Sequence, residues 1–113
     1  MQRSEIHLAS FPFGDVPGMK LRPVLLLTGP IGLTTEVLVA YISSVMPSTL
    51  LPSDVVLDPT IPKDRATHLK TTSVLRLHKL ATIHTISVRR YLGKISAKTE
   101  SEVCTKLRVL LSL

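Results

Sequence analysis

The 113-residue chain contains no tryptophan and only two phenylalanines and two tyrosines, so leucine, isoleucine and valine must fill its core. Valine and isoleucine favour pleated strands. Its single cysteine, Cys104, excludes an internal disulfide bond. A domain of this length buries about two-thirds of the surface that its unfolded chain exposes, so it needs no covalent cross-link. The composition therefore predicts one compact domain over residues 1–113, built mainly from aliphatic strands.

Long uninterrupted hydrophobic runs are also missing. Residues 23–45 carry a single charge, Glu36, but Gly29, Pro30 and Gly32 break this stretch in its middle. Two buried strands joined by a turn explain the pattern better than a membrane span does. The first ten residues lack the apolar segment of a signal peptide. We therefore expect a cytoplasmic protein that does not bind membranes, which agrees with the scarcity of cysteine.

Acidic residues are few. The chain has 14 lysines and arginines against 8 aspartates and glutamates, a net charge of +6. The excess is concentrated in the second half, at Lys63, Arg65, Lys70, Arg76, Lys79, Arg89, Arg90 and Lys94. Such an excess suits a polyanionic partner, either nucleic acid or an acidic peptide. The four histidines and Cys104 show no zinc-binding spacing, and no glycine-rich phosphate loop precedes a helix, so we expect no metal and no other cofactor.

Apolar stretches bounded by proline, glycine and other turn formers predict short strands over residues 5–10, 24–28, 36–43, 54–58, 73–77 and 81–86. A loop is expected over residues 14–20, where turn formers are dense.

The hydrophobic period changes near the C-terminus. Val103, Leu107, Leu110 and Leu111 recur at helical spacing, and Thr99 with Glu102 has the pattern of a capping box. These features predict an amphipathic helix over about residues 97–112 that lays an apolar stripe over the sheet. The expected fold is mainly β with a C-terminal helix, a small antiparallel barrel.

Three stretches carry a resemblance to a known family. The first runs from Ser4 to Phe13 and, after a glycine-bearing loop, continues as Lys20-Leu21-Arg22-Pro23. The second is Val39–Ser44, and the third is Ser73–His78, followed by Leu92–Ser96 before the terminal helix. In this order and spacing they resemble the MazF/PemK family of toxin–antitoxin ribonucleases. The resemblance covers nearly the whole chain. It implies an SH3-like (CcdB-like) barrel that forms a symmetric homodimer, binds single-stranded RNA across the dimer groove and is blocked there by an acidic antitoxin.

The resemblance also implies an activity, the metal-independent and sequence-selective cleavage of single-stranded RNA, usually through attack of a 2′-hydroxyl on the adjacent phosphate. Such cleavage needs a base, an acid and fixed positive charge. Arg22 matches the arginine that the family uses at the scissile phosphate. Ser43 matches its strand-end hydroxyl, with Ser44 as the equivalent if the register slips by one. His78 stands where some members carry an acid, so we expect His78 to transfer the proton.

Further residues are expected to bind the RNA. Arg76 and His78 are two apart in an extended segment, so their side chains should share a face, with Leu75 and Leu77 on the other. Lys20 and Lys79 add positive charge, and Phe13 is a candidate for stacking on a base, although core packing competes with that role. For His84 a structural hydrogen bond is expected.

Two other functions fit the same fold. One is a non-catalytic inhibitory toxin such as CcdB, which poisons DNA gyrase. The other is a catalytically decayed relative that still binds RNA or antitoxin. Arg22 followed by proline, together with Ser43, favours the nuclease, whereas the missing acid at position 78 leaves both alternatives open.

Overall fold

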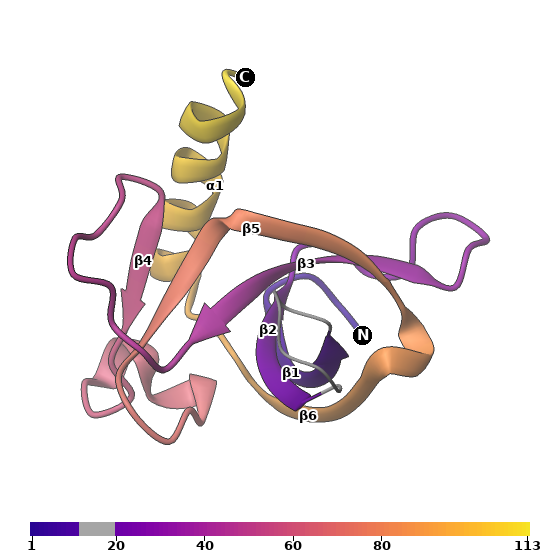
Figure 1. Cartoon of the computed structure of the whole chain (residues 1–113), viewed down its shortest axis with the longest axis horizontal. Coiled ribbons are helices and arrows are strands. Elements are labelled where there is room, and N and C mark those ends of the chain that lie inside the picture. Colours follow the sequence, from indigo (N-terminus) through magenta and orange to yellow (C-terminus); the bar gives the residue numbers. More distant parts are fainter. Residues whose placement is uncertain (12–19) are drawn as a thin grey trace.

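The computed structural model describes residues 1–11 and 20–113, so Phe13 lies outside the described part of the chain. It confirms a mainly β fold with a C-terminal helix (Figure 1). The elements are β1 (Glu5–Phe11), β2 (Lys20–Leu26), β3 (Glu36–Ser43), β4 (Asp54–Leu57), the 3₁₀ helix η1 (Pro62–Thr67), β5 (Ser73–His84), the 3₁₀ turn η2 (Thr85–Ser87), β6 (Val88–Lys94) and α1 (Ala97–Leu111).

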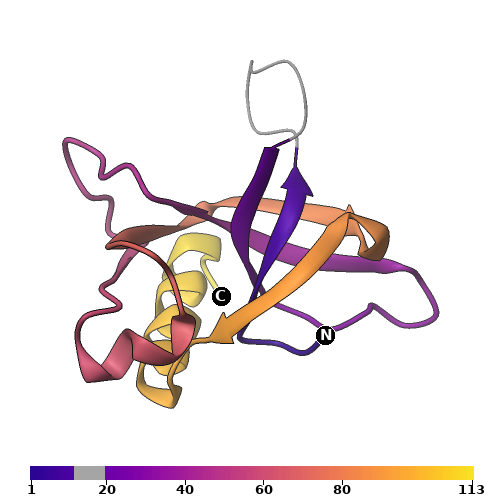
Figure 2. The same ribbon diagram turned by 90° about the horizontal axis from the view of Figure 1, so that it is seen from below.

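The six strands form one antiparallel sheet in the order β4-β5-β3-β2-β1-β6, which curls strongly (Figures 1 and 2). The sheet does not close, because β4 and β6 are both edges, so the expected barrel is only approximate. The 3₁₀ helix η1 follows β4 in the sequence. It packs against β6, at an edge of the sheet where another strand could otherwise pair. There the Nδ1 of His68 donates a hydrogen bond to the carbonyl of Leu92 over 2.8 Å. Gly93 lies against the backbone of Ala66 and Thr67.

The core is aliphatic, as the composition predicted. One cluster lies between the sheet and α1 and includes Ile6, Leu25, Ala40, Ile42, Val55, Leu57, Leu75, Leu77 and Val103. The second fills the curl of the sheet and comprises Ala9, Val24, Leu26, Val37, Val39 and Ile83. Neighbours such as Val24 and Leu25 belong to different clusters, so the central strand β2 buries both of its faces.

Strand β5 differs from the prediction of two strands at 73–77 and 81–86. It is one continuous strand with an irregularity in its middle. Tyr41 pairs with Arg76 while the preceding Ala40 pairs with Leu80, so three residues of β5 lie between these two pairs. Such an insertion bends a strand and disturbs the alternation of its side chains. Strand β6 was not predicted at all.

Helix α1 confirms the predicted bounds of about 97–112 but corrects the predicted cap. The helix begins one turn earlier than a Thr99–Glu102 capping box requires, because Ser96 is the N-cap. Its hydroxyl accepts a hydrogen bond from the backbone N–H of Thr99 over 3.1 Å. Thr99 is buried instead of capping the helix.

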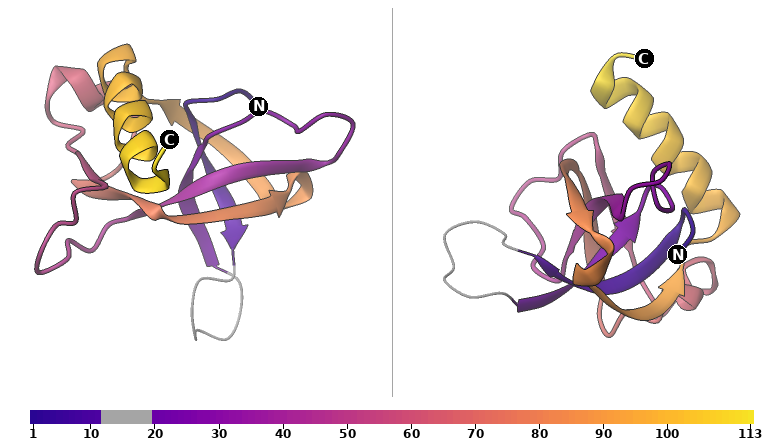
Figure 3. Two further views of the ribbon diagram at one scale, coloured as in Figure 1. Left: turned by 90° about the horizontal axis from the view of Figure 1, so that it is seen from above. Right: turned by 90° about the vertical axis from the view of Figure 1, so that its right-hand side faces the viewer.

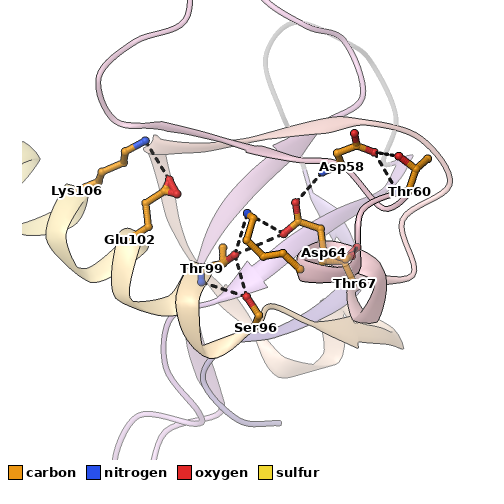
Figure 4. Close-up of polar contacts among 9 residues, drawn as sticks. Asp58, Thr60, Asp64, Thr67, Ser96, Thr99, Glu102 and Lys106 are labelled. Carbon is orange, nitrogen blue, oxygen red and sulfur yellow. Dashed lines mark hydrogen bonds and ion pairs between the residues drawn. The ribbon is translucent and has the colours of Figure 1, made fainter.

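A buried carboxylate joins η1 to this first turn (Figure 4). Asp64 is 1% exposed and accepts a hydrogen bond from the backbone N–H of Asp58 at 2.9 Å. Its other oxygen lies 3.1 Å from the ammonium of Lys63 and 3.4 Å from the hydroxyl of Thr99. The charge is therefore both paired and hydrogen-bonded, which a buried carboxylate needs.

The apolar stripe of α1 covers the sheet only in its first half. Val103 is buried and Leu107 packs against the same cluster, but Leu110 is 37% and Leu111 51% exposed. In Figure 3 the C-terminal half of the helix extends beyond the sheet. Among the helices in the described residues, none combines the length and the hydrophobicity that a membrane span requires.

Candidate functional site

A groove opens where strands β2 and β3 separate. The two strands pair only from Val24 to Leu26 and from Val39 to Tyr41, while the earlier part of β2 pairs with β1 alone. Beyond the last pair lies a groove of about 670 Å³, bordered also by β6 and by the segment after η1. We call it the Arg22 groove; its polar and aromatic lining comprises Arg22, Tyr41, Ser44, His68, Lys70, Thr71, Ser73, Arg90 and Tyr91.

The lining of the Arg22 groove is basic. Arg22, Lys70 and Arg90 contribute positive charge, and none of the lining residues that the structure describes is an aspartate or a glutamate. Arg22 forms no ion pair with any residue that the structure describes, so no described carboxylate neutralises its guanidinium. Both tyrosines of the chain border the same groove. Positive charge beside aromatic rings is the combination that single-stranded nucleic acid sites use.

The two candidate hydroxyls have different surroundings. The Oγ of Ser43 accepts a hydrogen bond from the backbone N–H of Val45 over 3.1 Å and lies 3.2 Å from the Val45 carbonyl. Ser43 thus satisfies the backbone at the end of β3. Ser44 is exposed and lines the Arg22 groove. The structure therefore brings Ser44, the one-residue alternative, together with Arg22.

Arg76 has a partner that sequence reasoning missed. Its Nε and Nη2 donate to the two carboxylate oxygens of Asp54, at 3.1 and 3.3 Å. Asp54 is buried, and this two-pronged contact holds the Arg76 guanidinium against β4. Lys79 is exposed, with its ammonium 5.5 Å from the centre of the Tyr41 ring, a cation–π contact beside the groove. Lys20 is exposed at the start of β2.

His78 lies elsewhere. It borders a second, apolar groove of about 570 Å³ together with Leu51 and, from α1, Val109 and Leu110. The expectation that His78 shares a face with Arg76 rested on unbroken alternation, which the irregularity in β5 removes. Within a single chain His78 does not line the Arg22 groove, and its catalytic role stays a prediction.

The histidine that does line the Arg22 groove is His68, which sequence reasoning did not select. It follows η1 in the left-handed conformation, with φ of 53°, and its ring bonds to Leu92, 24 residues further along the chain. No local pattern indicates such a contact. Lys70 and Arg90 also line this groove. They were predicted only as part of the basic excess, with no individual role.

The ring of His84 has structural partners at both nitrogens. The Nδ1 of His84 accepts a hydrogen bond from the N–H of Ile86 over 3.1 Å, so its Nε2 donates to the hydroxyl of Thr35 over 2.7 Å. This confirms the structural role expected for His84.

Among the described residues, no three histidine, cysteine, aspartate or glutamate side chains lie close enough to share a metal ion.

Buried His7 supports the β6 side of the Arg22 groove. Its ring meets that of Tyr91 edge to face, with centroids 5.4 Å apart. Its Nε2 lies 2.9 Å from the carboxylate of Glu5, and this hydrogen bond lowers the pKa of Glu5. The cross-strand contact restrains the Tyr91 ring from behind.

Comparison with solved structures returns similar folds. The Mycobacterium tuberculosis toxin MazF-mt6 is 25% identical, with a TM-score of 0.75 over 96% of this chain and 97% of that chain. MazF from Deinococcus radiodurans is 21% identical, with a TM-score of 0.73 over 100% and 97%. An endoribonuclease in complex with its cognate antitoxin, from a mycobacterial species, is 17% identical, with a TM-score of 0.72 over 100% and 96%. At these lower identities the last two likenesses concern the fold alone.

Comparison with curated protein sequences gave no match. The sequence does match a family model over residues 2–111, nearly its whole length, and that model describes the PemK-like, MazF-like toxins of type II toxin–antitoxin systems. The curled six-stranded sheet with its C-terminal helix and the likeness to MazF-mt6 agree with this match. The chain therefore belongs to the PemK-like, MazF-like family of toxins.

Proposed function

We propose that the protein is a metal-independent endoribonuclease that cleaves single-stranded RNA at selected sequences. The observation that carries the proposal is the Arg22 groove, whose described lining brings three cations and two tyrosines together without a carboxylate. Membership of this toxin family supports it, and a protein of similar fold from a mycobacterial species bears the name endoribonuclease. We also assign the protein to the cytoplasm, where its RNA substrate is found.

Arg22 carries the central role in this proposal. Its planar guanidinium can donate two hydrogen bonds to a phosphate and stabilise the charge that grows on it during attack by the 2′-hydroxyl. Ser44 lines the same groove and its hydroxyl would contact the same phosphate, while Ser43 would first have to leave Val45. His78 could serve this phosphate only if a second protomer brought it there. Lys20, Arg76, Lys79 and Phe13 remain predicted RNA contacts.

A single incubation tests this function. The purified protein is mixed with a long, mixed-sequence RNA in the presence of EDTA, and the cut ends are mapped. We expect cuts at one short recurring sequence. RNA that is bound but left intact would indicate a decayed relative, and RNA that is neither bound nor cut would indicate an inhibitory toxin of the CcdB kind.

We expect the protein to be a two-fold symmetric dimer. The Arg22 groove lies on the surface of a small sheet, and a second copy would enclose an RNA strand that one copy cannot. Sedimentation at micromolar concentration should give twice the 12.4 kDa of one chain. A single 12.4 kDa species at that concentration would contradict the dimer.

An acidic antitoxin segment is the protein partner that we propose for the same groove. One structure of similar fold is a complex with its cognate antitoxin. In the present chain Arg22, Lys70 and Arg90 form no ion pair with a described residue and would attract such a segment, so the complex should weaken as salt rises.

A further inference from the structure

Among the residues that the structure describes, the lining of the Arg22 groove contains one imidazole, that of His68, and no carboxylate. RNA cleavage through a 2′-hydroxyl requires a group that accepts the hydroxyl proton. His78 borders the other groove, so within one protomer it is not available for this step. The side chain of His68 is exposed to solvent at the groove, where a bound RNA could reach it.

The hydrogen bond of His68 sets which ring nitrogen is free. Its Nδ1 lies 2.8 Å from the carbonyl oxygen of Leu92. A carbonyl can only accept, so Nδ1 carries the proton, and in the neutral ring Nε2 holds the lone pair. Within the described part of the chain, Nε2 has no hydrogen-bond partner. The ring is thus held by one nitrogen and open at the other, which is the arrangement that a general base needs.

The backbone of His68 is also unusual. Its φ of 53° places it in the left-handed region, which is sparsely populated by residues other than glycine and in which asparagine and histidine are enriched. Residues held in such conformations concentrate at functional sites. Here the conformation ends η1 and turns the chain towards Leu69, which is buried in the core, so the position of the imidazole is determined by packing on both sides.

We propose that His68 is the general base of the Arg22 groove. Its Nε2 removes the proton of the 2′-hydroxyl as the 2′-oxygen forms a bond to phosphorus. The bond between phosphorus and the 5′-oxygen breaks, and the leaving 5′-oxygen takes a proton from water. Arg22 holds the phosphate during this exchange. The assignment rests on the proposed endoribonuclease function and adds to it the residue that moves the proton.

The test uses His68→Asn and His68→Gly, two substitutions that the left-handed backbone tolerates. It compares them with substitutions at two histidines that do not line the groove, His84 and His78. His68→Asn can keep the hydrogen bond to Leu92 but has no basic nitrogen. Loss of a general base typically slows a reaction about a hundredfold to ten-thousandfold, and we expect a loss in that range. His84→Asn, at a histidine outside the Arg22 groove, is the matched control and should cut RNA at nearly the native rate. His78→Ala tests the competing assignment of the base. Affinity for an oligonucleotide with a 2′-deoxynucleotide at the cleavage position should be unchanged in His68→Asn.

A second measurement separates catalysis from structure. His68→Gly leaves a space where the ring was, and imidazole added to the buffer should restore part of its cleavage rate. Native-rate cleavage by His68→Asn, or a slow His68→Gly that imidazole does not restore, would overturn the assignment. Loss of activity in His78→Ala alone would return the role to that residue. If the native protein cuts no RNA, the proposed function itself fails, and the assignment of His68 falls with it.

Discussion

Arg22→Ala should abolish measurable RNA cleavage while leaving the protein folded. Removing a fixed donor at a developing negative charge typically costs about a hundredfold to a thousandfold in rate, or roughly 3–4 kcal/mol. Arg22 is half-buried at the parting of β2 and β3 and has no ion-pair partner among the described residues, so its loss leaves no described carboxylate unpaired. Initial rates on a short RNA containing the cleavage sequence would measure the effect.

Two further variants make this result specific. Arg22→Lys should recover little activity, because an ammonium keeps the charge but lacks the planar pair of donors. Arg89→Ala removes an exposed charge of β6 that does not line the Arg22 groove, and it should cut nearly as fast as the native protein. Equal losses of cleavage rate in Arg22→Ala and Arg89→Ala would mean that cleavage depends on the net charge of the protein and not on the position of Arg22.

Gly93→Ala should destabilise the protein by about 3 kcal/mol, at the upper end of what overpacking costs. A methyl group at this position would lie 2.1 Å from the carbonyl oxygen of Ala66 and 2.8 Å from the backbone of Thr67. These are backbone atoms, so no side-chain rotation relieves the contact, and η1 must move away from β6. The melting temperature should fall by roughly 10 °C or more.

The neighbouring Lys94→Ala is the control for Gly93→Ala, because Lys94 is exposed on the same strand and its truncation meets nothing. The displaced η1 should also carry His68 away from the carbonyl of Leu92, so Gly93→Ala should cut RNA more slowly even below its melting temperature. A melting temperature within a few degrees of the native value would show that η1 and β6 adjust easily.

The fold was predictable because local patterns decide most of it. Pro23 before an apolar run marks β2, a short run of β-branched and other apolar residues marks β3, and the spacing of Val103 and Leu107 marks α1. Strand β6 escaped prediction because it is an edge strand with exposed Arg89 and Arg90, and it carries little apolar signal.

The candidate site was predictable only in part. Arg22 is identified by its neighbour Pro23 and by the family resemblance, whereas the irregularity in β5 depends on pairing with β3 and separates His78 from the groove. The ion pair of Arg76 with Asp54 joins residues 22 apart. The place of His68 depends on Leu92, 24 residues away. Contacts between residues this far apart in the sequence follow from the packing of whole elements. No local sequence pattern encodes that packing.

The docking of α1 makes folding depend on a segment that follows all the strands of the sheet in the sequence. Val103 completes the cluster that contains Leu25 and Leu75, and Glu100 binds Ser4 at the opposite end of the sequence. A nascent chain that has not yet reached α1 therefore exposes one apolar face of its sheet to water. Because a ribosome builds the chain from its N-terminus, the sheet gains this cover only after α1 has been made. The order of translation thus delays the completion of the core until every strand of the sheet has been synthesised.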